Sequence, residues 1–575
     1  MTSDARPVIE TPGKCHVRVE GKELTNLISR VELDQYIYDH HVLNVTVKQA
    51  AETAEEREFY DPSLFASFLG KSISTHVPTT LDGAEGENAL EFIGVITKVS
   101  FDSSIDSVKK IHITALSPTI ALDGAKKNAF YHEMKASDII GSIVRSYPMT
   151  IGKVDSTDGT YKFSVQYEES DFDYVMRLAT GAGLFAFYDG SEFRAVKANS
   201  SASDEAVWPE TLGAFTVGLG TSQTEFKSEV YNYEQKKTYT QDSKSISSTA
   251  ALSDLSKISP EASAKIFDSS SFTKVVAVDD ARSLDQILER ERSRSVGKMI
   301  SCSGESTVAK LSVGRCVKIK GMGKFDGTYW LTRVRHVFDE SGKYHNRFEC
   351  TPLDTAFPAF KSSRQAVTQL QPAVVVDNND PEKLGRIKVK FPWSDSDETP
   401  WARYSAAHAG KDRGAYCIPE IDDEVLVGFE FGNPDKPIIV GSLYNVDDAP
   451  HSKTGSDENL IKAFITKSGN EVIFNDESGN EEIKISMKDG KNQIVLGLSG
   501  PSITITSEGD IGIKGANITI ESSDKMTLKA GSDIEIKAQS NLKAEAGANL
   551  KSKAGASYDA EGAMVNVKGN PIKLN

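Results

Sequence analysis

The sequence lacks the features of a secreted, disulfide-stabilised or membrane-spanning protein. Its five cysteines are odd in number, widely spaced and without a C-x-x-C pair, which is typical of free thiols in a reducing compartment. The N-terminal segment MTSDARPVIETPGK has no apolar core, and no apolar run approaches the ~20 residues of a membrane span. We therefore expect no signal peptide, no stable membrane insertion, and assembly in the cytoplasm, with another route taking the protein outside the cell.

Enzyme and metal-site signatures are missing as well. The ten histidines are scattered, and the sequence contains no H-E-x-x-H, G-x-S-x-G or P-loop motif. We expect the one histidine pair, His40–His41, to be exposed on a strand and Asp422–Asp423–Glu424 to be a solvated strand entry. We expect Cys417 to pack in a barrel, because no histidine can be placed beside it as a base. These absences predict no catalytic, cofactor-binding or metal-binding residues, and no enzyme.

Positive charge is in short supply. The chain has 66 Lys and Arg against 82 Asp and Glu, a net charge of −16. Residues 501–575 contain nine basic and nine acidic residues, so the whole acidic excess lies in the first 500 residues. Binding to phosphate groups needs clustered Lys and Arg, so the acidic body argues against a nucleic-acid partner and an anionic membrane surface.

The C-terminal part of the sequence contains a repeat of eight residues. One column of the repeat consists of Met526, Ile534, Leu542, Leu550 and Tyr558. A second column, two residues further on, shrinks along the chain in the order Leu528, Ile536, Ala544, Ser552 and Ala560. Charged residues alternate with these columns and small residues close each octad, which predicts short strands with alternate residues inward. A short fixed period is typical of a solenoid or a fibre.

One octad is too small to form a stable unit within one chain. A strand of about five residues spans ~17 Å, cannot pair its own N–H and C=O groups, and adds too few apolar residues for a core. Three chains wound around one axis would pair the strands and bring the apolar columns together. The alternatives are a single-chain β-solenoid and a disordered low-complexity tail. The expected core column, with a one-residue slip near Ile518, is Ile503, Ile511, Ile518, Met526, Ile534, Leu542, Leu550 and Tyr558.

The last strand is apolar at the point where such a needle would end. Its sequence is AMVNVKGNPIKLN, with the large residues Met564, Val565, Val567, Ile572 and Leu574. At the blunt end of a trimer, exposed apolar residues and unpaired strand edges need a cap. We expect these residues to dock a tip protein; the alternative is that they close the trimer on themselves.

The remaining sequence predicts a mainly β protein with four domains. Short alternating strands separated by turn residues indicate β-barrels with inserted helices over 1–365 and a small barrel over 366–450. Neck strands are expected over 451–500, followed by a triple-stranded β-helix over 501–575.

Four helices are expected within the first domain. A short one is expected between Phe59 and Gly70. Capping residues and apolar spacing place the others after Ser137, from Ser170 or Asp171 to Gly181, and over 279–299. The segment 198–275 is rich in Ser, Thr, Asp and Ala and has weak periodicity. We therefore expect loops and edge strands there.

Motifs in the barrel segment point to a family. The segment reads NNDPEKLGRIKVKFPW, then WARY, then PEIDDEVLVGFEFGNPDKPIIVGSLYN. It resembles the oligonucleotide/oligosaccharide-binding (OB) barrel of VgrG-type spike proteins, which read D-P-x-x-L-G-R, F-P-W, P-E-x-G-D-E-V-L-V and G-x-x-Y-N. Asp422 departs from the pattern, because the family commonly has glycine there. The neck segment TKSGNEVIFND and the hub segments FIGVITKV and VQYEESDFDYVMRL are similar to the same family.

The resemblance covers nearly the whole chain and implies a function. VgrG-type proteins resemble contractile-phage hubs and needles; they form homotrimers at the front of an inner tube and are driven through a target envelope. The resemblance implies a PAAR-type tip protein at the C-terminal end, inner-tube and baseplate proteins at the hub, and effectors as cargo. On firing, the protein would be extracellular or inside the target cell.

Three points stay open at the level of the sequence. One alternative is a spike that also degrades cell walls or modifies a target, and another is a glycan- or oligonucleotide-binding module. The machine could be a type VI secretion system, an extracellular injection particle or a phage tail, because all three use this plan.

Overall fold

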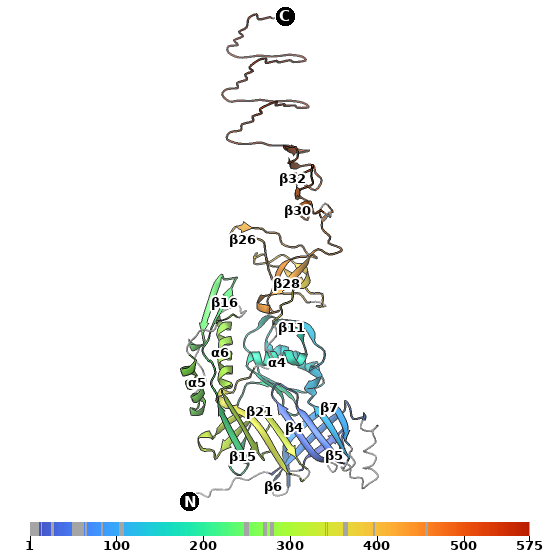
Figure 1. The fold of residues 1–575 in the computed structure, drawn as a ribbon, viewed down its shortest axis with the longest axis vertical. Helices are drawn as coiled ribbons and strands as arrows, with labels where there is room; N and C mark the ends of the chain where they lie inside the picture. The colour runs from blue at the N-terminus through green and yellow to red at the C-terminus, as the bar shows by residue number, and fades with distance from the viewer. Residues whose placement is uncertain are drawn as a thin grey trace. The chain divides into compact units, whose positions relative to one another are not determined.

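A computed structural model gives the protein as two compact units, Met1–Ala449 and Pro450–Asn575. The fold is mainly β, as the sequence predicts (Figure 1). The structure describes residues 11–12, 14–24, 28–48, 63, 66–81, 84–102, 109–245, 252–267, 273–275, 281–339, 341, 343–359, 366–394, 397–452, 454 and 458–573.

The base of the first unit is a sheet of 14 strands. Its main path runs β15-β19-β22-β21-β4-β5-β8-β7-β6-β2-β3, with β1, β14 and β20 paired off this path. Burial alternates along its strands, as in β5 and β8, because successive side chains point to opposite faces. The strands are β1 (Thr11–Pro12), β2 (His16–Val19), β3 (Lys22–Glu23), β4 (Ile28–Tyr36), β5 (Val42–Lys48), β6 (Ser72–Leu81), β7 (Ala84–Asp102), β8 (Lys110–Leu116), β14 (Ser203–Val207), β15 (Leu212–Leu219), β19 (Ile300–Ser306), β20 (Cys316–Lys320), β21 (Gly327–Phe338) and β22 (Tyr344–Pro352).

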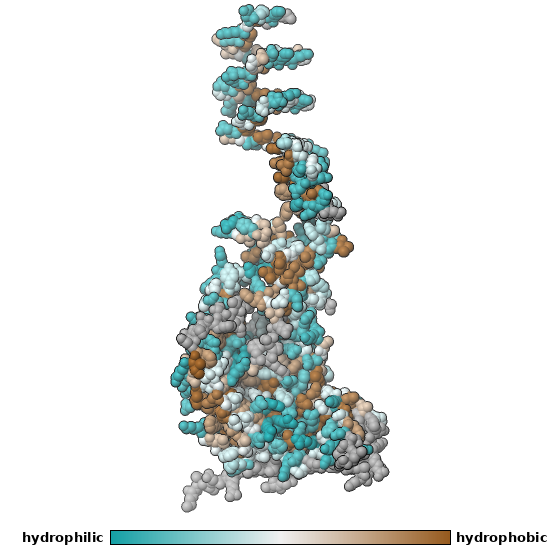
Figure 2. Space-filling view, viewed as in Figure 1, coloured by the Kyte–Doolittle hydropathy of each residue, from teal (hydrophilic) through white to brown (hydrophobic). Residues whose placement is uncertain are grey.

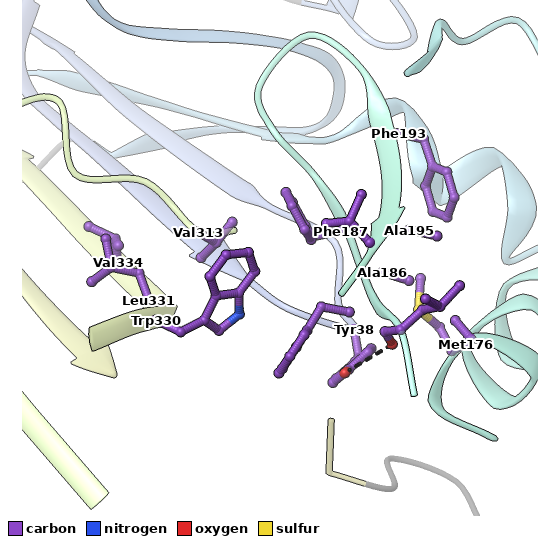
Figure 3. Packing of buried hydrophobic residues seen from close by; sticks show 14 of the residues in the cluster. Tyr38, Met176, Ala186, Phe187, Phe193, Ala195, Val313, Trp330, Leu331 and Val334 are labelled. Atoms are coloured by element: carbon purple, nitrogen blue, oxygen red, sulfur yellow. Dashed lines mark hydrogen bonds between the residues drawn. The ribbon is translucent and has the colours of Figure 1, made fainter. Parts of the chain in front are cut away.

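Helices and short strands pack on this sheet and complete a structure that we call the hub (residues 11–359). Its largest cluster of buried side chains joins Trp330 of β21, Tyr38 and Phe187 (Figure 3). The Tyr38 hydroxyl donates a hydrogen bond to the Leu184 carbonyl at 3.3 Å. The covering elements are β9 (Lys127–Met134), α3 (Ala136–Arg145), β10 (Ile151–Val154), β11 (Tyr161–Glu169), α4 (Asp171–Ala182), β12 (Phe185–Tyr188) and β13 (Phe193–Val196). Short 3-10 turns are η2 (Pro118–Leu122), η3 (Ser243–Ser245), η4 (Gly323–Phe325), η5 (Leu353–Thr355) and η6 (Glu430–Gly432).

The capping residues of α4 confirm the helix predicted there. The Ser170 hydroxyl accepts a hydrogen bond from the Asp173 N–H, which satisfies one of the free amides of the first turn. Gly183 ends the helix in the left-handed conformation, at φ 79°, that glycine adopts without strain. The helix predicted after a Ser137 cap is also present, but α3 begins two residues earlier than expected, at Ala136, and Lys135 rather than Ser137 is its N-cap residue. The short helix expected between Phe59 and Gly70 falls partly outside the described residues.

The expectation of loops and edge strands over 198–275 is wrong in one respect, because a helix lies within this segment. Helix α5 (Asp254–Ile266) contains Pro260, and its inward side chains are the buried Ser256, Ser259 and Ser263. A helix that buries serines and exposes Ile258 and Ile266 lacks the apolar inward face that sequence patterns detect. The neighbouring elements are β16 (Lys227–Asn232), β17 (Lys237–Asp242), β18 (Thr273–Val275) and the predicted helix α6 (Ala281–Gly297).

The second part of the first unit is a small barrel built on a five-stranded sheet. Its order is β24-β23-β28-β29-β25, and its core includes Val375, Val389, Val427 and Ile439. Asp422 adopts φ 76°, so the turn keeps the conformation that glycine would have there. The strands are β23 (Gln371–Asp377), β24 (Lys388–Lys390), β25 (Arg403–Tyr404), β26 (Ala409–Gly410), β27 (Arg413–Gly414), β28 (Glu424–Phe429) and β29 (Pro437–Ser442).

The second unit consists of a neck and a coil. The neck is an antiparallel meander of β30 (Ile461–Ile465), β31 (Glu471–Asn475), β32 (Glu482–Ser486), β33 (Gln493–Gly497) and β34 (Ser502–Thr506). After β34, the described residues 507–573 contain no helix or strand. Figure 1 shows this part of the chain as an open coil of successive turns.

Candidate functional site

The predicted core column lies entirely on the surface of the second unit. All eight column residues are exposed, from 49% for Met526 to 72% for Ile503 and Tyr558. Ile503 lies in β34, opposite Leu496 of β33, and the other seven lie in the coil. Figure 2 shows apolar residues, in brown, on the surface of the second unit. Burial of one Leu or Ile side chain stabilises a protein by about 1.5–3 kcal/mol. Covering this column would therefore add a large amount of stability that the single chain lacks.

The backbone of the coil is equally unpaired. Among the described residues 507–573, no N–H or C=O group forms a backbone hydrogen bond with another residue of the chain. Extended segments with open edges are templates for pairing with other strands. The coil therefore has neither a core nor a hydrogen-bonded ladder of its own.

The neck shares this property. Its single sheet exposes Phe464, Phe474, Ile485 and Leu498 at between 46% and 59%. Ile473 is its one buried apolar side chain among the described residues. A single-layer sheet of this kind needs a second surface against which its apolar side chains can pack.

The predicted tip residues are exposed as far as the structure describes them. Met564, Val565, Val567 and Ile572 are 48–78% exposed, and Leu574 lies outside the described residues. Their role in docking stays a prediction.

A joint between barrel and hub is a feature that the sequence did not predict. The hub side chain Phe130 packs on the barrel side chain Trp393, with ring centroids 5.0 Å apart. The Asp435 carboxylate accepts a hydrogen bond from the Val165 N–H at 2.7 Å, and the Gln371 amide donates to the Tyr167 hydroxyl at 2.7 Å. Barrel and hub thus share one core, and polar bonds fix their register.

A buried arginine strengthens this joint. Arg386 donates from Nε and Nη2 to the two carboxylate oxygens of Asp380, at 3.0 and 2.8 Å, and from Nη1 to Glu234 of the β16–β17 turn at 3.2 Å. The side chains of Arg386 and Asp380 are 6% and 3% exposed. Burial alone would raise the pKa of Asp380, but hydrogen bonds from Arg386 and from three backbone N–H groups lower it to about 2. The β16–β17 hairpin is thereby tied to the barrel.

Arg403 makes a second, more exposed contact with the same hairpin. Its guanidinium lies 4.5 Å from the centre of the Tyr233 ring, and it donates to Glu430 at 3.0 Å. Arg386 and Arg403 both match the family's barrel motifs, so two motif arginines hold the hub hairpin. The β16–β17 hairpin, which lies in the segment 198–275, thus contacts the barrel at two arginines.

Two expectations about single residues are wrong. His40–His41 lies in the turn between β4 and β5 rather than on a strand, and His41 is fully buried beside the Phe92 and Tyr188 rings rather than exposed. Cys417 is exposed rather than packed in the barrel. Both errors arise because burial depends on which distant segments cover a strand, and a short motif contains no such information.

Buried histidines should make the hub sensitive to acid. Burial lowers the pKa of His41 to about 4 and that of His336 to about 3, against an ordinary value of 6.5. The groups around His41 are the Tyr36 carbonyl, Asp39, His40 and Asp189, and those around His336 are Gln35, Tyr344 and His41 itself.

Above pH 6.5 these histidines are neutral in both states, so they add no pH dependence. Below it only the unfolded chain binds the protons, so we expect the free energy of unfolding to fall by about 1.4 kcal/mol per pH unit and per histidine, down to the folded pKa. Urea unfolding between pH 7.5 and 4.5 tests this. His336→Gln should flatten the slope by about one proton. His345→Gln, at an exposed position, should not; equal slopes in all three proteins would contradict the prediction.

No arrangement for chemistry emerges among the described residues. In the described part of the chain, no group of three or more His, Cys, Asp or Glu side chains could hold a metal ion. The helices described by the structure are each too short or too polar to cross a membrane.

Comparisons with known proteins agree with the barrel and hub. Residues 371–444 match the family described as the type VI secretion system/phage-baseplate injector OB domain. Residues 70–340 match a second family, described as the Alg8 N-terminal domain.

Two curated relatives come from Pseudomonas aeruginosa. The type VI secretion system spike protein VgrG1b is 24% identical over 409 residues, covering 64% of this chain and 53% of that protein. The spike protein VgrG5 is 30% identical over 235 residues, covering 34% of this chain and 29% of that protein. The match thus spans about half the length of the first relative and less of the second.

A solved structure extends the likeness to most of the chain. The Francisella PdpA–VgrG complex, in its lidded form, aligns with a TM-score of 0.55 and 11% identity, covering 87% of this chain and 80% of that one. The lidless form gives a TM-score of 0.54 and covers 98% of that chain. At this level of identity the likeness establishes the fold.

The barrel and the hub are thus similar, in sequence and in fold, to those of VgrG-type spike proteins of type VI secretion.

Proposed function

We propose that this protein is the homotrimeric spike of a contractile injection apparatus, located at the front of the inner tube and driven through a target envelope. The observation that carries the proposal is the coil, in which every large apolar side chain of the repeat is exposed and the described backbone is unpaired. Neither state is stable for an isolated chain in water.

Three interwound chains would correct both deficits together. Each coil strand would pair with strands of the two other chains, and the column from Ile503 to Tyr558 would meet at the axis. Bending such a rod requires many hydrogen bonds to break at once, which gives the axial rigidity that puncture needs. The neck sheets would pack against one another through their exposed apolar faces.

The domain roles follow from this arrangement. Residues 1–365 form the hub, 366–450 the OB barrel, 451–500 the neck and 501–575 the needle. Met564, Val565, Val567, Ile572 and Leu574 dock a PAAR-type tip protein, inner-tube and baseplate proteins bind the hub, and effectors travel as cargo. A protein complex of this fold, the Francisella PdpA–VgrG complex, supports partner binding in general.

The protein acts mechanically rather than as an enzyme. The relatives that match are named spike proteins, which favours this role over a cell-wall-degrading activity or a glycan-binding module. It assembles in the cytoplasm within the particle, and firing places it outside the cell or inside the target cell.

Light scattering on the purified chain tests the proposal. We expect a mass of three times 62.6 kDa for residues 1–575. A truncation ending at Gly500, which removes the needle, should dissociate on dilution at a higher concentration than the full chain. A monomeric full-length chain at every concentration would refute the trimer and leave the binding-module interpretation.

A further inference from the structure

Two cysteines face each other across neighbouring strands of the hub sheet. Cys302 of β19 is the cross-strand partner of Cys350 of β22, and the two strands run antiparallel. Partners directly opposite each other in an antiparallel pair share a face of the sheet and have Cα atoms about 4.5–5.5 Å apart. A disulfide bond spans Cα atoms about 4.4–6.8 Å apart, so this register allows the two sulfur atoms to be joined without a shift of the strands.

The two thiols already interact with each other. The Cys350 thiol donates a hydrogen bond to Sγ of Cys302, which lowers the pKa of Cys302 although burial acts in the opposite direction. Burial and this same hydrogen bond raise the pKa of Cys350. Cys302 is therefore the sulfur that ionises first, and the thiolate is the reactive form of a cysteine.

A cavity gives a small molecule access to the pair. Cys302 and Cys350 are each only 4% exposed, but both line a cavity of about 890 Å³ whose wall also includes Tyr38, Phe185 and Thr351. Cavities of about 300–1,000 Å³ admit drug-sized molecules. A small organic reagent can therefore reach Sγ of Cys302.

We propose that Cys302 and Cys350 form a covalent modification site, at which a small organic disulfide oxidises the two thiols to an intramolecular disulfide bond. The Cys302 thiolate attacks one sulfur of the reagent RSSR and forms a mixed disulfide, and the other half leaves as RS⁻ and takes up the proton that Cys302 gave up. Sγ of Cys350 then attacks Sγ of Cys302, and its proton passes to the second departing thiolate. The protein loses two electrons, and the reagent gains them as two RSH molecules.

The third buried cysteine nearby is not a competing partner. Cys316 of β20 lies opposite Trp330 of β21 rather than opposite a cysteine. Its thiol donates a hydrogen bond to the Asn199 carbonyl at 3.3 Å, and burial raises its pKa to about 11. Cys316 therefore stays protonated, and the bond is specific to the other two sulfurs.

The disulfide would tie β19 to β22 and close a loop that contains β20 and β21. A cross-link of this kind restricts the unfolded chain and so stabilises the folded one. In a reducing cytoplasm the thiols stay free, and in an oxidising compartment the bond would form. This timing rests on the proposed function, because it requires that the spike leaves the cytoplasm, whereas the chemistry of the site does not.

Oxidation of the full-length chain by 2-hydroxyethyl disulfide tests the site. Cys417→Ser serves as the background, because the exposed Cys417 thiol would react by itself. We expect the folded background chain to lose two of its four thiols, and mass spectrometry of its non-reduced digest to join the peptides that contain Cys302 and Cys350. The urea midpoint of the oxidised chain should lie above that of the reduced chain, and dithiothreitol should reverse this shift.

Single substitutions separate the roles of the sulfurs. In Cys350→Ser the mixed disulfide meets no second thiol, so a hydroxyethylthio group should remain on Cys302. Cys302→Ser should keep its thiols in the folded state, because the thiolate that starts the reaction is absent. Cys316→Ser is the matched control and should form the bond like the background chain.

The linked peptide from the background chain decides the question even where a variant fails to fold. Four free thiols in the folded chain, under conditions that oxidise the urea-unfolded chain, would overturn the proposal, and so would a bond that includes Cys316. A monomer that forms the Cys302–Cys350 bond would refute the trimeric spike but not the site. A trimer without the bond would refute the site but not the spike.

Discussion

Replacing Ile534 and Leu542 together by aspartate should dissociate the proposed trimer at protein concentrations at which the unaltered full-length chain stays trimeric. In three interwound chains the two positions would bring six carboxylates to the axis, where no cation faces them. Burial of unpaired carboxylates costs more free energy than nearby contacts can offset, so the three chains should separate along the needle. Light scattering should then give 62.6 kDa in place of three times that mass.

The neighbouring surface positions provide the control for this experiment. Lys537→Asp with Lys543→Asp adds the same number of carboxylates, but at outward positions whose side chains are 79% and 77% exposed in the single chain. This control should stay trimeric. If the Ile534/Leu542 variant also stays trimeric, or if both variants dissociate alike, the column from Ile503 to Tyr558 does not lie at an axis.

The second large effect is expected from Arg386→Ala. The substitution leaves Asp380, with a side chain only 3% exposed, without its cationic partner and also releases Glu234 of the hub hairpin. Removing one member of a buried ion pair typically costs about 3–5 kcal/mol. Urea unfolding should show this loss, and hydrogen exchange should rise first in the barrel strands.

Arg403→Ala is the matched control for the joint. Its side chain is 43% exposed, and exposed ion pairs contribute about 0–1 kcal/mol. We therefore expect a small change in stability from this variant. Equal losses from the two arginine variants would mean that burial does not distinguish them and that the joint is held by its apolar core alone.

Local structure could be predicted wherever the signal is local. The Ser170 cap, the αL glycine after α4 and the alternating burial of β5 each depend on a few neighbouring residues. At Asp422 the sequence departs from the glycine of the motif, so the conformation of this turn could not be predicted. Its φ shows that the turn keeps the conformation that glycine would adopt. Helix α5 was not predicted, because its buried residues are serines and its sequence therefore has no apolar stripe.

The contacts that shape the site are mostly between distant residues. Asp435 bonds to a backbone group 270 positions away, and Arg386 bonds to a carboxylate 152 positions away. No period or spacing encodes such a pair. The needle differs, because its eight-residue repeat predicts the column residues directly from the sequence. That these residues meet at an axis stays a proposal.

The open coil also has a consequence for the order of assembly. Since its described residues form no backbone hydrogen bond with one another, a single chain contains no nucleus from which the coil could grow. The neck differs, because each of its strands pairs with the next along the chain, although its exposed apolar side chains still need a second surface. In the proposed trimer, three necks would first meet and align, and only then could the needle form toward its tip. Formation of the needle in such a trimer should thus depend steeply on protein concentration.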